Sequence, residues 1–230
     1  MNLFDIDKKK TDFLLSFADE KDLEVSSVIL ALLSNDFTNE FYIAKQIICD
    51  IMNNKPYEYI LSYDKHMDFY SQDVRPIAGV ISNKHLHNLC VRLNKTLKAN
   101  DTIFNGYKEI KTRKKNGVIM EYVCISKFLS GGTGFQENTS MSCYRYSLIF
   151  YWLSYKAHLW ALDEDSLLLP CNDRILKVAI ENDLMKKVYG FQQRNAIKLT
   201  NIAKEKYGEH LYAFYKLYED LIDYGCSELC

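Results

Sequence analysis

The chain has 230 residues, of which 48% are apolar and 26% are charged, and its formal net charge at pH 7 is −1. This length is enough for one substantial core, or for two helical lobes that share one. The near-neutral charge argues against a protein that coats nucleic acid through bulk electrostatics, although a local basic patch needs only a few Lys or Arg residues on one face. Apolar runs such as LIFYWL (148–153) are far too short to span a bilayer, so we expect no membrane segment.

Helical periodicity dominates the chain, because apolar residues recur at intervals of three and four. The sequence MSCYRYSLIFYWLSYKAHLW (141–160) is apolar nearly all round in its middle, which predicts a helix buried on most faces. The periodic segments, in chain order, are 25–33, 39–53, 86–97, 141–160, 190–206 and 211–222.

One segment has a different pattern. Residues rich in β-formers flank Asn116-Gly117, a dipeptide typical of tight hairpin turns, so we expect a small β-hairpin near 107–126. Its tip is basic and could touch phosphates, although lysines on an exposed hairpin also keep strand edges from aggregating. The basic residues of the tip are Lys111, Arg113, Lys114 and Lys115.

The cysteines and histidines indicate no metal centre. Seven cysteines are scattered without paired CxxC spacing, and no histidines stand at a spacing typical of metal ligands. The segment MNLFDIDKKK has no signal-peptide pattern, so we expect reduced thiols in a cytoplasmic protein. We expect no metal and no cofactor.

A glycine-rich turn, LSGGTGFQENTSMSCYRY (129–146), precedes the long buried helix. Such a turn can present backbone N–H groups to a phosphate at a helix N-terminus. No GK[ST] follows the glycines, so the turn is not a Walker motif. The alternative is a plain loop in which Asn138, Thr139 or Ser140 caps the helix.

The stretch LLLPCNDRI (167–175) places three polar residues directly after Pro170. Asn172 or Asp173 can cap a helix that runs to about Leu184, and this role needs nothing else. The functional alternative is a carboxylate at a helix N-terminus, where it can activate a water molecule or stabilise an oxocarbenium charge as a base–sugar bond breaks.

Residues 142–184 resemble an uncharacterised bacterial family that is related to the helix-hairpin-helix DNA glycosylases. That family has a "CKR" start, a helix of the type "LFLRWMVR", a Gly-Leu-Trp and a final "PLDTH" before another helix. The matching positions here are Cys143, Arg145, Trp152, Leu159-Trp160 and Pro170. In addition, DLEVSSVILALL (22–33) is similar to the family's "DREVVALIAS".

The resemblance implies an all-α fold of two helical lobes that form one glycosylase-like unit over 1–230, with the β-hairpin as an insertion. Lobe A would cover about 22–126, and lobe B about 1–21 plus 127–230. It also implies a phosphate-binding turn and a set of substrate contacts. The turn would use Gly131, Gly132, Gly134, Ser140 and Ser142, and the substrate contacts would be Tyr144, Arg145, Trp152 and Arg174.

Two departures from the family bear on catalysis. Aligned without gaps, "PLDTH" meets PCNDR, so the family's Asp falls on Asn172 and Asp173 comes one position later. The family's "CKR" meets CYR, so Tyr144 replaces the Lys and no Schiff-base lysine is expected there.

We therefore expect a monomeric enzyme that acts on an N-glycosidic bond of a damaged or modified base, in DNA or a nucleoside. Asp173 and Asn172 would be its catalytic residues. The alternatives are a catalytically inactive nucleic-acid-binding module on the same scaffold and a purely structural helical partner protein.

Overall fold

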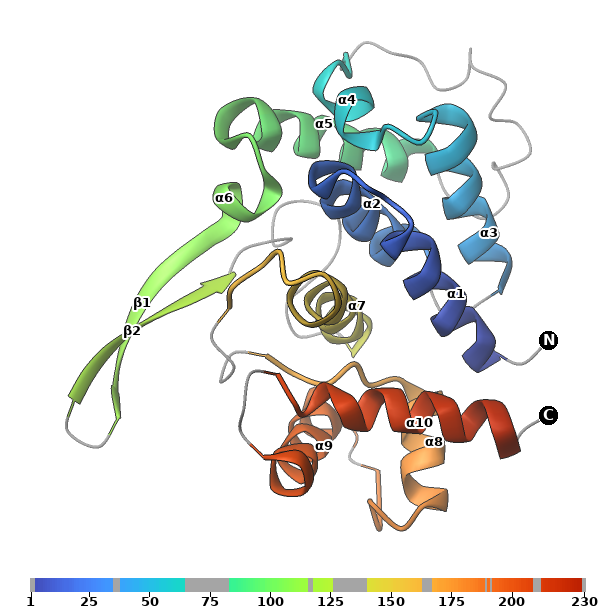
Figure 1. The fold of residues 1–230 in the computed structure, drawn as a ribbon, viewed down its shortest axis with the longest axis vertical. Coiled ribbons are helices and arrows are strands. Elements are labelled where there is room, and N and C mark those ends of the chain that lie inside the picture. Colours follow the sequence, from blue (N-terminus) through green and yellow to red (C-terminus); the bar gives the residue numbers. More distant parts are fainter. Residues whose placement is uncertain are drawn as a thin grey trace. The chain divides into compact units, whose positions relative to one another are not determined.

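A computed structural model describes residues 3–34, 38–64, 83–115, 118–125, 140–162, 167–188, 190, 192–208 and 212–228. These residues are mostly helical, which confirms the expected helical class at that level (Figure 1). The elements in chain order are α1 (Leu3–Leu15), α2 (Glu20–Leu33), α3 (Thr38–Gln46), the π-helix η1 (Ile47–Ile51), α4 (Pro56–Leu61), α5 (Asn83–Asn100), α6 (Ile103–Tyr107), β1 (Lys108–Lys115), β2 (Val118–Ile125), α7 (Ser140–Phe150), the π-helix η3 (Tyr151–Lys156), α8 (Asp173–Glu181), α9 (Gln192–Tyr207) and α10 (Tyr215–Glu228).

The chain divides into two compact units, and the division falls inside α1 and inside the strand region. Unit 1 consists of Met1–Thr11, Glu109–Cys124 and Phe135–Cys230. Unit 2 consists of Asp12–Lys108 and Ile125–Gly134. Each unit is described by itself below.

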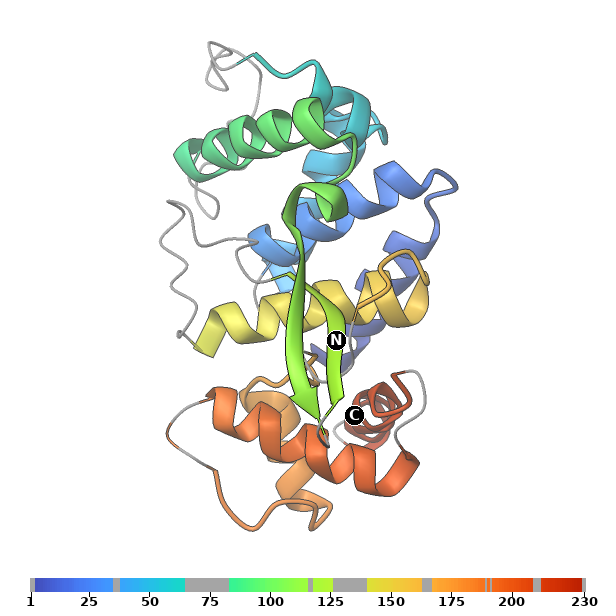
Figure 2. The same ribbon diagram turned by 90° about the vertical axis from the view of Figure 1, so that its left-hand side faces the viewer.

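In unit 2 the central helix is α2, which packs against α3 and α4, while α5 packs against α4 and α6 (Figure 2). Every residue of α2 from Leu23 to Leu33 is buried, because its apolar side chains surround the helix rather than forming one stripe. Asp19 caps this helix by accepting hydrogen bonds from the backbone N–H groups of Lys21 and Asp22. Because α2 is buried on all sides, we infer that it forms the core of unit 2.

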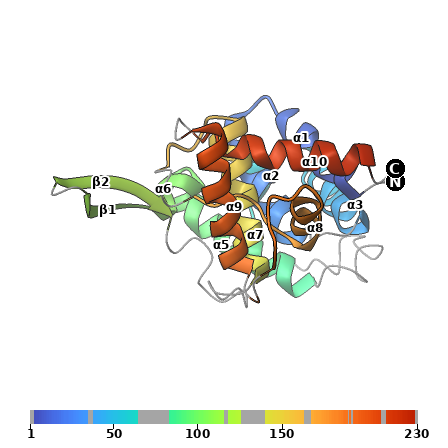
Figure 3. The same ribbon diagram turned by 90° about the horizontal axis from the view of Figure 1, so that it is seen from below.

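In unit 1, α10 packs against α8 and α9, and α7 also packs against α9 (Figure 3). The helix predicted over 141–160 occurs as α7 followed directly by η3, and its middle is buried as expected. Trp152 and Leu153 of η3 are buried, and the ring of Tyr151 in the same helix meets the ring of Tyr218 in α10 edge-on, with centroids 4.9 Å apart. Within the described ranges, every helix is too short or too polar to span a bilayer.

The region expected to form a hairpin contains β1 and β2, which pair as a two-stranded sheet (Figure 1). The expected turn, Asn116-Gly117, lies outside the described residues. Two strands with only two residues between them must be antiparallel, since a parallel pair needs a long crossover connection.

Candidate functional site

The first candidate is the N-terminus of α8, where the sequence placed a catalytic cluster. Asn172 is the N-cap: its backbone is extended, with φ −126° and ψ 179°, and its side-chain oxygen accepts the backbone N–H of Ile175 at 2.9 Å. The Asn172 side chain is buried, and so are Pro170 and Cys171 before it. Asn172 therefore has the ordinary capping role of an asparagine at the start of a helix.

The other two residues of the cluster, Asp173 and Arg174, differ from Asn172 in their surroundings. Asp173, the first residue of α8, is exposed. Arg174 is mostly buried: its Nη2 lies 3.4 Å from Oδ2 of Asp7, and its guanidinium carbon lies 5.6 Å from the centre of the Phe4 ring. The three consecutive polar residues thus comprise a buried cap, an exposed carboxylate and a mostly buried ion-pair partner.

Sequence reasoning missed the partner of Arg174. Asp7 of α1 is 3% exposed, and Lys10 on the same helix is fully buried. A signal was available, because Phe4, Asp7 and Leu14 follow the helical spacing of three and seven residues and all three are buried. A charged residue on the apolar stripe of a helix predicts a buried ionic contact, since an isolated charge there costs several kcal/mol.

The expected substrate contacts lie in the core of unit 1. Tyr144, Arg145 and Trp152 are all buried, and the Trp152 indole N–H donates to the Thr11 hydroxyl at 3.2 Å. These side chains therefore pack inside the unit. The expected phosphate-binding glycines, Gly131, Gly132 and Gly134, lie outside the described residues. Ser140 and Ser142 lie in the first turn of α7.

A second polar cluster of unit 1 surrounds Glu219 of α10. Its carboxylate accepts hydrogen bonds from the hydroxyls of Tyr151 and Tyr155, both at 3.2 Å, and from Nζ of Lys156 at 3.0 Å. Burial, reinforced by the negative charge of Glu219, raises the pKa of Tyr155 to about 12 and that of Tyr151 further. Because both carboxylate oxygens are engaged by η3, this cluster is suited to holding α10 in place.

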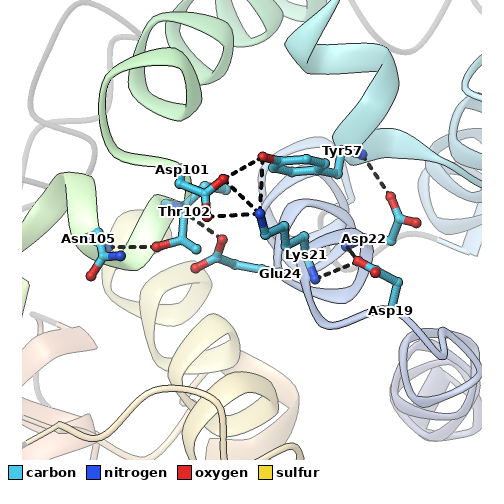
Figure 4. A network of polar contacts seen from close by, with 9 residues as sticks. Asp19, Lys21, Asp22, Glu24, Tyr57, Asp101, Thr102 and Asn105 are labelled. Atoms are coloured by element: carbon cyan, nitrogen blue, oxygen red, sulfur yellow. Dashed lines mark hydrogen bonds and ion pairs between the residues drawn. The ribbon is translucent and has the colours of Figure 1, made fainter.

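In unit 2 the most connected polar residues join α2 to α4 and to the turn before α6 (Figure 4). Nζ of Lys21 donates to both carboxylate oxygens of Asp101, at 2.7 and 2.8 Å, and the Tyr57 hydroxyl donates to the same carboxylate at 2.9 Å. The ammonium and hydroxyl donors lower the pKa of Asp101. Asp101 has a φ of 66°, so this contact also fixes a left-handed residue between α5 and α6.

The buried carboxylate of this network belongs to Glu24 of α2, which is 4% exposed. Its two oxygens accept the backbone N–H groups of Ile103 at 2.8 Å and Phe104 at 2.9 Å, and Thr102 caps the same helix through the N–H of Asn105 (Figure 4). A carboxylate from one helix thus satisfies the free N-terminal donors of another. Both of its oxygens are used in joining α2 to the N-terminus of α6.

The remaining candidate is the ribbon, by which we mean β1 and β2. The β1 sequence KEIKTRKK has five Lys or Arg residues among eight and a single Glu. Among the described side chains Lys108, Thr112 and Lys114 are exposed, and so are Ile110 (68%) and Ile119 (73%). The ribbon therefore offers positive charge and uncovered apolar side chains to a partner.

The described residues contain no group of three or more His, Cys, Asp or Glu side chains that could hold a metal ion. No protein-family model, no curated protein and no solved structure matches the chain. The likeness to helix-hairpin-helix glycosylases therefore stays a prediction from the residues quoted above.

Proposed function

We propose that this protein binds nucleic acid through the ribbon, as a binding module on a glycosylase-like helical scaffold. The charge of β1 carries the proposal. Five cations stand among eight residues of a chain whose net charge is −1, so positive charge is concentrated locally on this strand. Local clusters of Lys and Arg neutralise phosphates and release counterions, and this supplies most of the affinity of non-specific binding.

The proposal favours binding over catalysis because of Asn172. In the resemblance, this position corresponds to the catalytic Asp, and an amide can neither take a proton as a general base nor oppose an oxocarbenium charge with a negative one. Its side-chain oxygen is also occupied by the N–H of Ile175. Asp173 is exposed, whereas electrostatic stabilisation of a reacting group is strong in a site from which water is excluded.

A binding titration tests the proposal. Fluorescence anisotropy with labelled duplex DNA, single-stranded DNA and RNA would compare the wild-type protein with the double variant Lys108→Gln/Lys114→Gln, since both lysines are exposed on β1. We expect the variant to bind roughly tenfold more weakly, and the slope of log K against log salt to fall by about 1 for each phosphate-contacting lysine removed.

The matched control is Lys95→Gln/Lys98→Gln, which removes the same charge from two exposed lysines of α5. This control should keep the wild-type affinity and salt slope. Equal losses in both double variants would mean that only the net charge matters. Absence of binding by the wild-type protein to all three probes would also contradict the proposal.

A further inference from the structure

We propose that one face of the ribbon enters the major groove of duplex DNA and contacts thymine methyl groups through Ile110 and Ile119. This inference rests on the proposed function and names the form of nucleic acid and the groups that are read.

The face is defined by strand alternation. Ile110, Thr112 and Lys114 are every second residue of β1, so they share one face of the strand, and all three are exposed. With two residues between antiparallel strands, Lys115 stands opposite Val118 and Lys114 opposite Ile119. Ile119 therefore belongs to the same face, which we call the Ile face.

The Ile face exposes more apolar surface than is usual for a strand face that contacts only water. Ile110 and Ile119 are 68% and 73% exposed, while the other exposed large apolar residues of the described chain range from 38% to 51%. Solvent faces of two-stranded ribbons are normally polar, and exposed apolar side chains on a strand invite association with another molecule. Two uncovered isoleucines beside Lys114 therefore indicate a contact surface.

The charge of the ribbon selects the partner. Over 108–125 it has five Lys or Arg residues against Glu109 and Glu121, so it is complementary to a polyanion. Uncovered isoleucines favour a partner that also presents apolar groups, and in duplex DNA the thymine methyl groups of the major groove meet this need. Thr112, Lys108 and Lys114 on the Ile face can donate hydrogen bonds to base edges or phosphates. The same register places Glu121 opposite Thr112, so two lysines stand against one carboxylate on this face.

The dimensions of the ribbon fit this groove. A two-stranded ribbon is narrow enough to enter the major groove of B-DNA, whereas the deep and narrow major groove of A-form RNA excludes it. Ile110 and the Lys114–Ile119 pair are four residues apart along the strand, which is about 13 Å or about four base-pair steps. The Ile face can therefore reach two thymine methyl groups about four base pairs apart.

Removal of the methyl group from the DNA gives a direct test. An alternating adenine–thymine duplex of about two helical turns offers thymine methyls in every register, and the same duplex with uracil for thymine lacks them. We expect the wild-type protein to bind the thymine duplex about three- to tenfold more tightly. The variant Ile110→Thr/Ile119→Thr removes the longer branch of each isoleucine and leaves one methyl group, so it should lose most of this preference. It should keep the wild-type salt slope, and threonine retains the β-branched shape that suits a strand.

The control variant is Ile197→Thr, which changes an exposed isoleucine of α9 and should keep the preference for thymine. Equal binding of both duplexes by the wild-type protein, with a normal salt slope, would overturn the inference and leave the proposed function intact. Tighter binding to single strands or to RNA would do the same. A wild-type dimer in size-exclusion chromatography that the double variant abolishes would assign the Ile face to a second copy instead, and failure to bind any probe would remove both proposals.

Discussion

Arg174 at the start of α8 forms an ion pair with Asp7 of α1, with Nη2 and Oδ2 separated by 3.4 Å. Asp7 is 3% exposed, and the Arg174 side chain is 15% exposed. The pair joins the N-terminal helix of unit 1 to a helix far along the sequence. Arg174, which the resemblance makes a substrate contact, is thus engaged within unit 1.

We expect Arg174→Met to lower the free energy of unfolding by about 3 kcal/mol or more, because it leaves the Asp7 carboxylate buried without its guanidinium partner. Urea denaturation monitored by circular dichroism would measure the loss. The control Lys177→Met on the exposed side of α8 should cost less than about 0.5 kcal/mol. Equal effects of the two substitutions would show that the ion pair contributes little.

The cap of α8 gives a second prediction. Asn172→Ala removes the acceptor of the Ile175 N–H, and we expect a loss of about 1 kcal/mol of unfolding free energy. Asn172→Ser retains a capping oxygen and should recover most of this loss. Chemical denaturation of the three proteins measures the difference. If Asn172→Ala unfolds at the wild-type urea concentration, the hydrogen bond does not stabilise the helix.

The helices were predictable where the pattern is local. The apolar spacing of 25–33 lies wholly within α2, and that of 86–97 within α5, since burial of one helix leaves a period of 3.6 residues in its sequence. The ends were less predictable. The α8 helix ends at Glu181, before the expected Leu184, because Asp183 adopts a left-handed φ of 56° that ends an α-helix.

The same reason applies to α10, which begins at Tyr215 although the periodic pattern begins at Leu211. Tyr212 has a φ of 66°, so a regular helix cannot run through it. The π-helices η1 and η3 were not predictable, because their hydrogen-bond pattern leaves no simple mark in the apolar spacing.

The candidate sites show the limit of local reasoning in another way. The sequence narrowed the cap to Asn172 or Asp173 and located the basic residues of β1, which are local features. It could not assign Arg174 to Asp7, or Glu24 to the N-terminus of α6, because those pairs join segments distant in the chain. Exposure of Ile110 and Ile119 depends on what the rest of the fold leaves uncovered, and composition does not encode it.

Tyr59 of α4 provides a third prediction, which concerns alkaline pH. Its hydroxyl oxygen is buried without a hydrogen-bond partner among the described residues, and burial raises its pKa to about 12. In the unfolded chain the pKa of a tyrosine is near 10, so folding raises the pKa of Tyr59. The contribution of such a group to stability is fully present below the unfolded-state pKa, and it is lost as the pH rises through the folded-state pKa. Stability should therefore fall between about pH 10 and pH 12.

Tyr59→Phe removes this titration and the unsatisfied hydroxyl together. We expect equal or slightly higher stability at pH 7, by up to about 1 kcal/mol, and a shallower loss above pH 10. Urea denaturation at pH 7 and across pH 9–11 would measure both. Tyr57→Phe serves as a contrast, because its hydroxyl donates to Asp101 and its loss should be destabilising at pH 7. A loss of more than about 1 kcal/mol at pH 7 in Tyr59→Phe would contradict an unpartnered hydroxyl.

The contact between α1 and α10 in unit 1 gives the last prediction. Gly225 lies inside α10, where alanine normally stabilises a helix by about 1 kcal/mol. A Cβ added at this position would stand 2.5 Å from the ring of Phe4, which is closer than real Cβ contacts allow. We therefore expect Gly225→Ala to lower the unfolding free energy by about 1–3 kcal/mol, because relief of the overlap must displace a buried ring.

The contrast for this prediction is the second-site variant Gly225→Ala/Phe4→Leu. The smaller side chain leaves room for the new methyl group, so the double variant should be more stable than the sum of the two single effects predicts. Denaturation of all four proteins gives this coupling free energy. Strict additivity would mean that Gly225 and Phe4 do not contact each other in solution, and that α1 packs against α10 in some other way.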